Sequence, residues 1–237
     1  MRLYRPSSLA NLRHCGDGIE GGFFIEGGTL HVKAPDAAPL TGRTLRAAVL
    51  AHGVYLEGLS YIEVRDLEIG FYDELAVRFR NSHHCALRDT ILHDSRQFVY
   101  VDRKDSTGNL IEGNRIFGSG VLGWPWDICH HGHDCSSNGI SVSAAGEGNI
   151  VRSNYVTGTF NGIYLGGWVT DYPETWALEN DVYDNLLEYI KDVATFTSSA
   201  TWCPPRATCS SIPRPAPCPV PKCSTTTTPT PPTRLAS

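Results

Sequence analysis

Two short segments of the sequence hold most of the side chains that could perform chemistry. Residues 119–137 combine tryptophans, histidines and carboxylates, and residues 167–179 combine tryptophans with a tyrosine and carboxylates. Exposed aromatic rings beside carboxylates are typical of sugar-binding sites, because flat rings stack on the apolar faces of sugars. The candidates for stacking are Trp124, Trp126, Trp168, Tyr172 and Trp176. The candidates for acid–base chemistry in these segments are His131, His133, Asp134, Asp171 and Glu174. In the alternative interpretation, the tryptophans fix the two segments to the body of the protein.

Cys129 and Cys135 lie on either side of these histidines, and three interpretations stay open. Cysteine, histidine and aspartate together could bind zinc, although their spacing matches none of the usual zinc-binding patterns. A disulfide that closes the loop is the simpler explanation in a secreted protein. If the thiols are free, His131 or His133 is available as an acid or base, because imidazole titrates near neutral pH. We assign no metal ligand from this spacing.

A repeated pattern in the middle of the chain indicates how these residues are positioned. Short segments superpose with equivalent positions at Leu67, Thr90, Asn114, Asn154 and Asn185. A second apolar strand follows each of the first four segments, and the two chemistry-bearing segments are insertions between these units. One unit of about 20–30 residues cannot bury its own apolar side chains, whereas stacked units share one continuous core. The asparagines should lie at corners, where asparagine tolerates left-handed backbone and can bond its stacked neighbours.

Two of these repeats carry a resemblance to a known family. The motifs Asn109-Leu110-Ile111-Glu112-Gly113-Asn114-Arg115-Ile116 and Gly148-Asn149-Ile150-Val151-Arg152-Ser153-Asn154 resemble right-handed parallel β-helix repeats of the pectate-lyase-like kind. The resemblance covers residues 53–194 and implies an all-β solenoid. Such repeats occur in polysaccharide lyases and glycoside hydrolases, so it also implies a secreted, polysaccharide-processing enzyme. Because the repeats encode stacking rather than chemistry, a non-catalytic glycan-binding or structural β-helix protein is the alternative.

The resemblance also suggests roles for the cluster Asp102-Arg103-Lys104-Asp105. In lyases of this fold, a lysine or arginine removes the proton next to a uronate carboxylate, often with Ca²⁺ bound to that carboxylate. Arg103 or Lys104 would be the base here, and Asp102 or Asp105 would hold the Ca²⁺. A hydrolase would instead use two carboxylates, whose separation sets the stereochemistry. The pairs of interest join Asp102 to Asp134, Asp171 or Glu174. A solvated charged turn is the competing interpretation.

Alternation along the second strand of each unit predicts which side chains face the core. The inward residues should be Val77, Phe79, Val99, Val101, Ile140, Val142, Ile163 and Leu165. The outward residues should form one column of Arg78, Tyr100, Ser141 and Tyr164, and a second of Arg80, Asp102, Ser143 and Gly166. We expect Arg78, Tyr100 and Tyr164 to contact a polysaccharide or oligosaccharide. An ordinary solvated face is the alternative.

The composition excludes several classes of function. All 25 acidic residues of the 237-residue chain precede residue 193, and four of the 20 basic residues follow it. The body is therefore more acidic than the net charge of −5 indicates, and it is a poor binder of nucleic acid. No run of 18 apolar residues occurs, so we expect no membrane span. The complete protein should be a monomer.

Both ends of the chain differ from the repeat. Residues 1–52 contain a predicted hairpin, Gly22–Val32, and begin without the apolar core of a signal peptide, so we expect a secretion signal further upstream. Residues 195–237 hold ten of the 15 prolines and four of the eight cysteines. Proline at this density blocks helices and sheets, which predicts a disordered tail and a truncated solenoid. A linker, a small disulfide knot and a frameshift near residue 194 are the explanations that stay open.

Overall fold

The N-terminal region folds as a short helix and a hairpin. The structure, a computed structural model, describes residues 3–14, 20–36, 39–126, 129, 137–166, 179–192 and 195–197. Helix α1 (Leu9–His14) begins where the Ser8 hydroxyl accepts the Asn11 amide at 3.1 Å, an N-terminal cap. Strands β1 (Gly22–Glu26) and β2 (Thr29–Lys33) pair antiparallel across a Gly27-Gly28 turn, which confirms the predicted hairpin.

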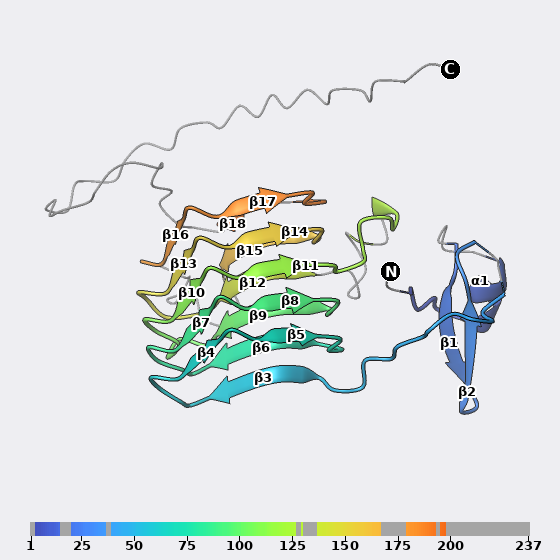
Figure 1. Ribbon diagram of the computed structural model, residues 1–237, viewed down its shortest axis with the longest axis horizontal. Coiled ribbons are helices and arrows are strands. Elements are labelled where there is room, and N and C mark those ends of the chain that lie inside the picture. The colour runs from blue at the N-terminus through green and yellow to red at the C-terminus, as the bar shows by residue number, and fades with distance from the viewer. Residues whose placement is uncertain are drawn as a thin grey trace, which may run out of the picture. The chain divides into compact units, whose positions relative to one another are not determined.

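The rest of the described chain forms three parallel sheets that stack rung upon rung (Figure 1). The six-stranded sheet contains β3 (His52–Glu57), β6 (Leu75–Arg80), β9 (Gln97–Asp102), β12 (Asn138–Ser143), β15 (Asn161–Gly166) and β18 (Thr195–Thr197). The second sheet contains β4 (Glu63–Arg65), β7 (Ala86–Arg88), β10 (Leu110–Glu112), β13 (Ile150–Arg152) and β16 (Asp181–Tyr183). The third contains β5 (Glu68–Gly70), β8 (Ile91–His93), β11 (Arg115–Phe117), β14 (Tyr155–Thr157) and β17 (Leu186–Glu188). This repeating register confirms the predicted parallel β-helix.

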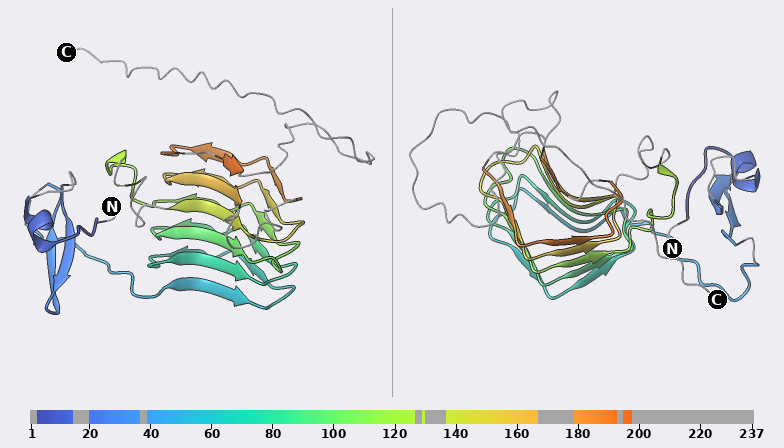
Figure 2. Two further views of the ribbon diagram at one scale, coloured as in Figure 1. Left: turned by 180° about the vertical axis from the view of Figure 1, so that it is seen from behind. Right: turned by 90° about the horizontal axis from the view of Figure 1, so that it is seen from above.

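The core runs along the axis that the three sheets enclose (Figure 2). All eight predicted inward residues of the six-stranded sheet are buried. The other two sheets each add one buried aliphatic residue per inner rung, such as Leu87 and Ile111 from one and Leu92 and Ile116 from the other. A period of two along each strand therefore explains the core, because only one face of each sheet can avoid water.

Buried asparagines form ladders at two corners of the solenoid. Asn114 Nδ2 donates to Oδ1 of Asn154 at 2.9 Å, and Asn154 Nδ2 donates to Oδ1 of Asn185 at the same distance. These bonds confirm the predicted stacking. The expectation of left-handed backbone at the asparagines is wrong by one position, because the positive φ angles belong to the preceding residues, Gly113, Ser153 and Asp184. The asparagine itself keeps an ordinary backbone, so that its amide can point into the stack.

The left-handed corner gives a prediction about stability. Ser153 has a φ of 55° where the rung below has Gly113 with a φ of 69°. A left-handed backbone costs an L-residue about 1–2 kcal/mol, and glycine avoids this cost. Glycine also loses more backbone entropy on folding, which offsets part of the gain. We expect Ser153→Gly to raise the free energy of unfolding by about 0.5–1 kcal/mol, measured by urea denaturation. Ser153→Ala is the control, and an equal gain in that variant would contradict the explanation.

The structure adds one strand that the sequence does not reveal. Strand β18 pairs in parallel with β15, so the six-stranded sheet reaches residue 197. Its sequence, Thr-Phe-Thr, carries no clear signal beside the proline-rich residues that follow. The predicted domain boundary near residue 194, the truncation and the disordered tail stay predictions, because residues 198–237 lie outside the described part of the chain.

Candidate functional site

An outward column of side chains crosses the six-stranded sheet. Backbone pairing sets Arg78 beside Tyr100, Tyr100 beside Ser141, and Ser141 beside Tyr164, in the predicted order. Tyr55 of β3 extends the column beyond Arg78 and is missing from the sequence prediction. The sequence could have predicted the outward position of Tyr55, because apolar residues flank it on both sides as they flank Arg78.

Arg78 and Asp102 form a bidentate ion pair on this face. Arg78 Nε donates to Asp102 Oδ1 at 3.1 Å, and Nη2 donates to Oδ2 at 2.7 Å. The guanidinium carbon also lies 5.7 Å from the ring centroid of Tyr55 and 5.6 Å from that of Tyr100. The hydrogen bonds with Asp102 raise the pKa of Arg78, against the opposing effect of burial. Both carboxylate oxygens of Asp102 are therefore engaged by a permanent cation, which makes this carboxylate a poor general base.

Arg103, Lys104 and Asp105 form the turn that follows β9. The Ser106 amide donates to the Arg103 carbonyl at 2.9 Å, and Arg103 has a φ of 80°. Left-handed residues recur at the equivalent place after neighbouring strands, at Gly58, Asn81 and Ala144. The backbone strain at Arg103 is thus a property of the solenoid rather than of a catalytic residue. Lys104 and Asp105 are exposed on this turn, as in the solvated-turn interpretation.

The middle of the outward column is buried although it faces away from the core. Ser141 and Ser143 are both buried, and the Ser141 hydroxyl has no hydrogen-bond partner among the described residues. A buried polar group without a partner costs about 1–3 kcal/mol.

The two described tryptophans of the first insertion differ in exposure. Trp124 is 8% exposed and packs with Val121, Cys129 and Phe160, and its ring centroid lies 5.2 Å from that of Tyr4 in an edge contact. Trp126 is 45% exposed, with its centroid 5.9 Å from that of Phe160. The burial of Trp124 favours the interpretation in which it fixes the insertion, whereas Trp126 could still stack on a ligand.

Lys191 holds the beginning of the same insertion. Its ammonium group donates to the carbonyls of Val121 at 3.2 Å and Leu122 at 3.1 Å, and it also bonds the carbonyl of Trp124. These three carbonyls equal in number the three N–H donors of the ammonium group. The pairing joins residues far apart in the sequence, so no local pattern could have predicted it.

Several predicted site residues lie outside the described part of the chain. They are His131, His133, Asp134, Trp168, Asp171, Tyr172, Glu174 and Trp176. The separation between Asp102 and a second carboxylate therefore stays a prediction. The structure does bring together Arg78, Tyr100, Asp102 and Arg103 around the end of β9.

The described cysteines are free thiols. Cys85 is buried with its sulfur 3.6 Å from the carbonyl of Leu59, and Cys129 is buried with its sulfur 3.8 Å from the carbonyl of Val121. The disulfide interpretation therefore does not hold for Cys129 in the structure. Within the described ranges, no three histidine, cysteine or acidic side chains lie close enough to hold a metal ion. The same ranges contain no helix long and apolar enough to cross a membrane.

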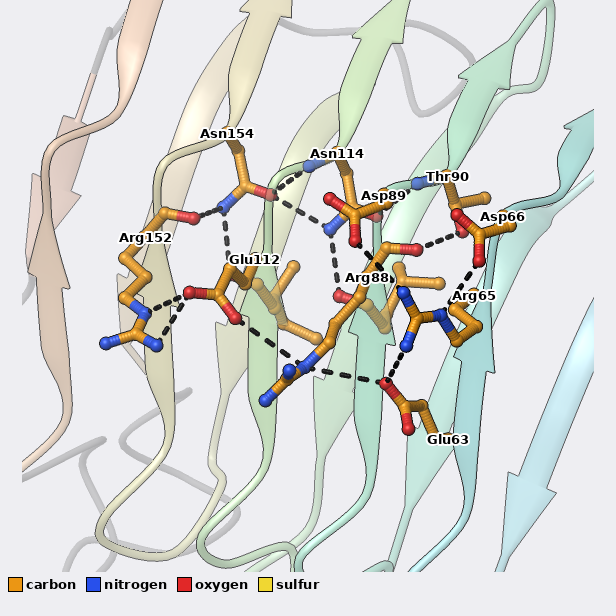
Figure 3. Close-up of polar contacts among 12 residues, drawn as sticks. Glu63, Arg65, Asp66, Arg88, Asp89, Thr90, Glu112, Asn114, Arg152 and Asn154 are labelled. Carbon is orange, nitrogen blue, oxygen red and sulfur yellow. Dashed lines mark hydrogen bonds and ion pairs between the residues drawn. The ribbon is translucent and has the colours of Figure 1, made fainter.

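A ladder of charges covers the second sheet and was not predicted (Figure 3). Glu112 accepts from Arg152 at 2.6 Å and lies 3.5 Å from Arg88, which in turn lies 3.7 Å from Glu63. The hydrogen bond with Tyr183, and then that with Glu112, raises the pKa of Arg152. The repeat alignment itself contained the signal, since Arg88, Glu112 and Arg152 occupy matching outward positions. Exposed pairs of this kind contribute little individually, and each charge is already partnered.

Fold and site together define a parallel β-solenoid whose described polar groups mostly bond one another instead of surrounding an open catalytic centre. A family model described as "Periplasmic copper-binding protein (NosD)" matches residues 25–212, which include the whole described solenoid. The chain belongs to this family. No curated protein and no solved structure matches it. The β-helix part of the predicted resemblance is confirmed, whereas the family description does not support its carbohydrate-active part.

Proposed function

We propose that this chain is a non-catalytic β-helix protein that works outside the cytoplasm and binds copper. The observation that supports the proposal is the family match over residues 25–212, because that family is described as periplasmic and copper-binding. A periplasmic location agrees with the expected position outside the cytoplasm. Secretion from the cell is a finer expectation that the proposal does not need.

The outward column supports a role without catalysis. A general base must be free to accept a proton from a substrate, and Asp102 instead accepts two hydrogen bonds from Arg78. The lysine predicted as the base of a lyase, Lys104, lies exposed on a turn. Ca²⁺ was tied to the lyase interpretation and has no role in this proposal.

Copper would have to bind away from the described rungs. The described cysteines are buried beside backbone carbonyls, and the described His93 bonds Asp94 at 2.9 Å and Glu68 at 3.1 Å. The donor types that copper prefers, imidazole and thiolate, are concentrated in the segment His130-His131-Gly132-His133-Asp134-Cys135. This segment lies outside the described residues. Its composition makes it the copper-binding candidate.

The copper proposal predicts a selective loss of metal affinity. Replacing His131 and His133 together with alanine should weaken copper binding by at least about tenfold, because both would be ligands. Titration calorimetry with copper and metal analysis of the dialysed protein measure the effect. The matched control replaces His83 and His84 with alanine, since this pair is also adjacent to a cysteine but belongs to a rung. Equal binding by both double variants, or no binding by the unaltered protein, would contradict the proposal.

A second candidate function is glycan binding by the outward column. The observation that favours it is the alignment of aromatic Tyr55, Tyr100 and Tyr164 in one outward column. A panel of polysaccharides tests it through binding and through products. Binding without products would support this candidate. Unsaturated uronides or new reducing ends would instead restore the lyase or the hydrolase as the function.

A further inference from the structure

The first rung of the solenoid differs chemically from the rungs above it. Three of its residues occupy columns that hold polar, hydrogen-bonding residues in the next rungs. Leu59 lies in the column of Ser82 and Ser106, Ile62 in that of Cys85 and Asn109, and Leu67 in that of Thr90 and Asn114. In the next rungs, these polar groups bond across the stack, as when Asn109 Oδ1 accepts the Cys85 amide at 3.0 Å and Asn114 Oδ1 accepts the Thr90 amide at 3.1 Å.

The aliphatic residues leave an apolar surface at this end. Leu59, Ile62 and Leu67 are 44%, 39% and 48% exposed. Terminal repeats of solenoids ordinarily turn a polar face to water, because an apolar end combined with open strand edges promotes association. Because this rung has leucine and isoleucine in place of polar stacking residues, we expect another segment to cover it.

The segment just before this rung carries a matching pattern. With a shift of 24 residues, Leu40, Gly42 and Leu45 superpose on Val64, Asp66 and Ile69. Gly42 has a φ of 79° and Asp66 a φ of 55°, so both adopt the left-handed corner that every rung uses. Leu40 and Leu45 would then be the inward residues of an additional rung. Arg43 would lie over Leu67 with its aliphatic stem.

Contacts in the structure already hold this segment near the first rung. The Arg46 guanidinium carbon lies 4.7 Å from the ring centroid of Phe71, which directly follows β5. The carbonyl of Ala51 accepts the amides of Glu74 at 3.1 Å and Leu75 at 2.9 Å. Residues 47–50, between these points, are exposed and belong to no helix or strand, and Leu45, just before them, is half exposed. The C-terminal part of the segment, residues 46–50, is therefore tethered beside the first rung without being paired to β4 or β5.

We propose that residues 39–50 are a strap that closes over the first rung and pairs with β4 and β5. Closure covers the apolar end and supplies the next strand edge, with Leu40 and Leu45 completing the core. The structure shows the open strap, which leaves the edge of β4 and β5 unpaired. This intramolecular occupant is favoured over a second copy of the chain because the register, the corner glycine and the tether all belong to the segment itself.

Hydrogen exchange measured by nuclear magnetic resonance tests the strap. The carbonyl of Ile62 accepts the amide of Ala86, and the amide of Asp66 donates to the carbonyl of Arg88, so the even-numbered residues in and beside β4 bond the β7 side. In a parallel ladder the intervening residues bond the opposite neighbour, and the amides of Glu63 and Arg65 consequently face the open edge. Closure of the strap should protect both amides in the unaltered protein.

Variants separate the strap from a general loss of structure. Leu45→Asp should raise the exchange rates of the Glu63 and Arg65 amides by at least about tenfold, because an ionised carboxylate opposes burial. Val49→Asp makes the same change at a residue that is 84% exposed and outside the rung pattern, and it should leave both rates unchanged. The amides of Val99 and Val101 report on the intact fold in each variant. Unprotected edge amides in the unaltered protein, equal effects of the two variants, or protection that grows with protein concentration would overturn the proposal.

Discussion

Replacement of Asn154 with alanine should lower the free energy of unfolding by about 3 kcal/mol. The Asn154 amide donates to the carbonyls of Ile111 and Arg152 and to Oδ1 of Asn185, each at 2.9 Å. Its oxygen accepts the backbone amide of Asn114 at 3.0 Å and the side-chain amide of Asn114 at 2.9 Å. Alanine would leave these buried groups without partners, and each such group costs about 1–3 kcal/mol before relaxation. Urea denaturation followed by circular dichroism measures the loss.

Asn185→Ala provides the matched control for this loss. Asn185 is the last asparagine of the same column and is only half buried, so water can replace part of its bonding. We expect this variant to lose about 1 kcal/mol. Asn154→Asp keeps the volume but removes the amide donors, and it should resemble Asn154→Ala. If the aspartate variant were as stable as the unaltered protein, packing rather than hydrogen bonding would be the role of Asn154.

Removal of the Asp102 carboxylate should have the second largest effect. Asp102→Ala leaves the Arg78 guanidinium charged and mostly buried between two tyrosine rings. Loss of one partner from a fully buried ion pair costs about 3–5 kcal/mol, and the partial exposure of Arg78 reduces the expected loss to about 2 kcal/mol. Denaturant unfolding of the variant measures it.

A double-mutant cycle shows whether the ion pair explains that loss. Arg78→Met keeps much of the side-chain volume and removes the charge, so the double variant should be more stable than Asp102→Ala alone. Purely additive losses would mean that the two residues act independently. Because the cycle measures stability, it also separates a structural role of Asp102 from the acid–base role that the sequence suggested.

The repeated strands could be predicted from the sequence because burial on one face leaves a period of two. Val99 and Val101 point inward for the same reason that Tyr100 points outward, and no distant contact is needed to see it. The asparagine corner was also visible, since equivalent positions recur. Its left-handed residue was misplaced because the sequence alone does not say which of two adjacent corner residues must turn.

The strand register alone does not determine which polar side chains of the candidate site form ion pairs with one another. Asp102 lies directly beside Arg80, yet its carboxylate bonds Arg78, the diagonal neighbour, whereas Arg80 lies 3.5 Å from Glu57 on the opposite side. Diagonal neighbours are within reach of long side chains, so several pairings are compatible with one register. The contacts of the insertions are harder to predict, because Lys191 bonds the carbonyl of Val121, which lies 70 residues earlier in the sequence. A local sequence pattern carries no information about such a pairing.

The first and last described rungs of the solenoid carry different side chains in the same columns, and this difference affects whether copies can stack into a filament. Two copies stacked head to tail would set Asn180 against Ile62 and Asn185 against Leu67, so that amides of the last described rung would meet aliphatic side chains of the next molecule. A desolvated amide facing a leucine loses its water and gains no bond. A solenoid with identical ladders at both ends would lack this barrier and could add molecules without limit. With the strap open, this mismatch opposes head-to-tail stacking on the last described rung, and substituting Asn at both Ile62 and Leu67 is the change that would remove it.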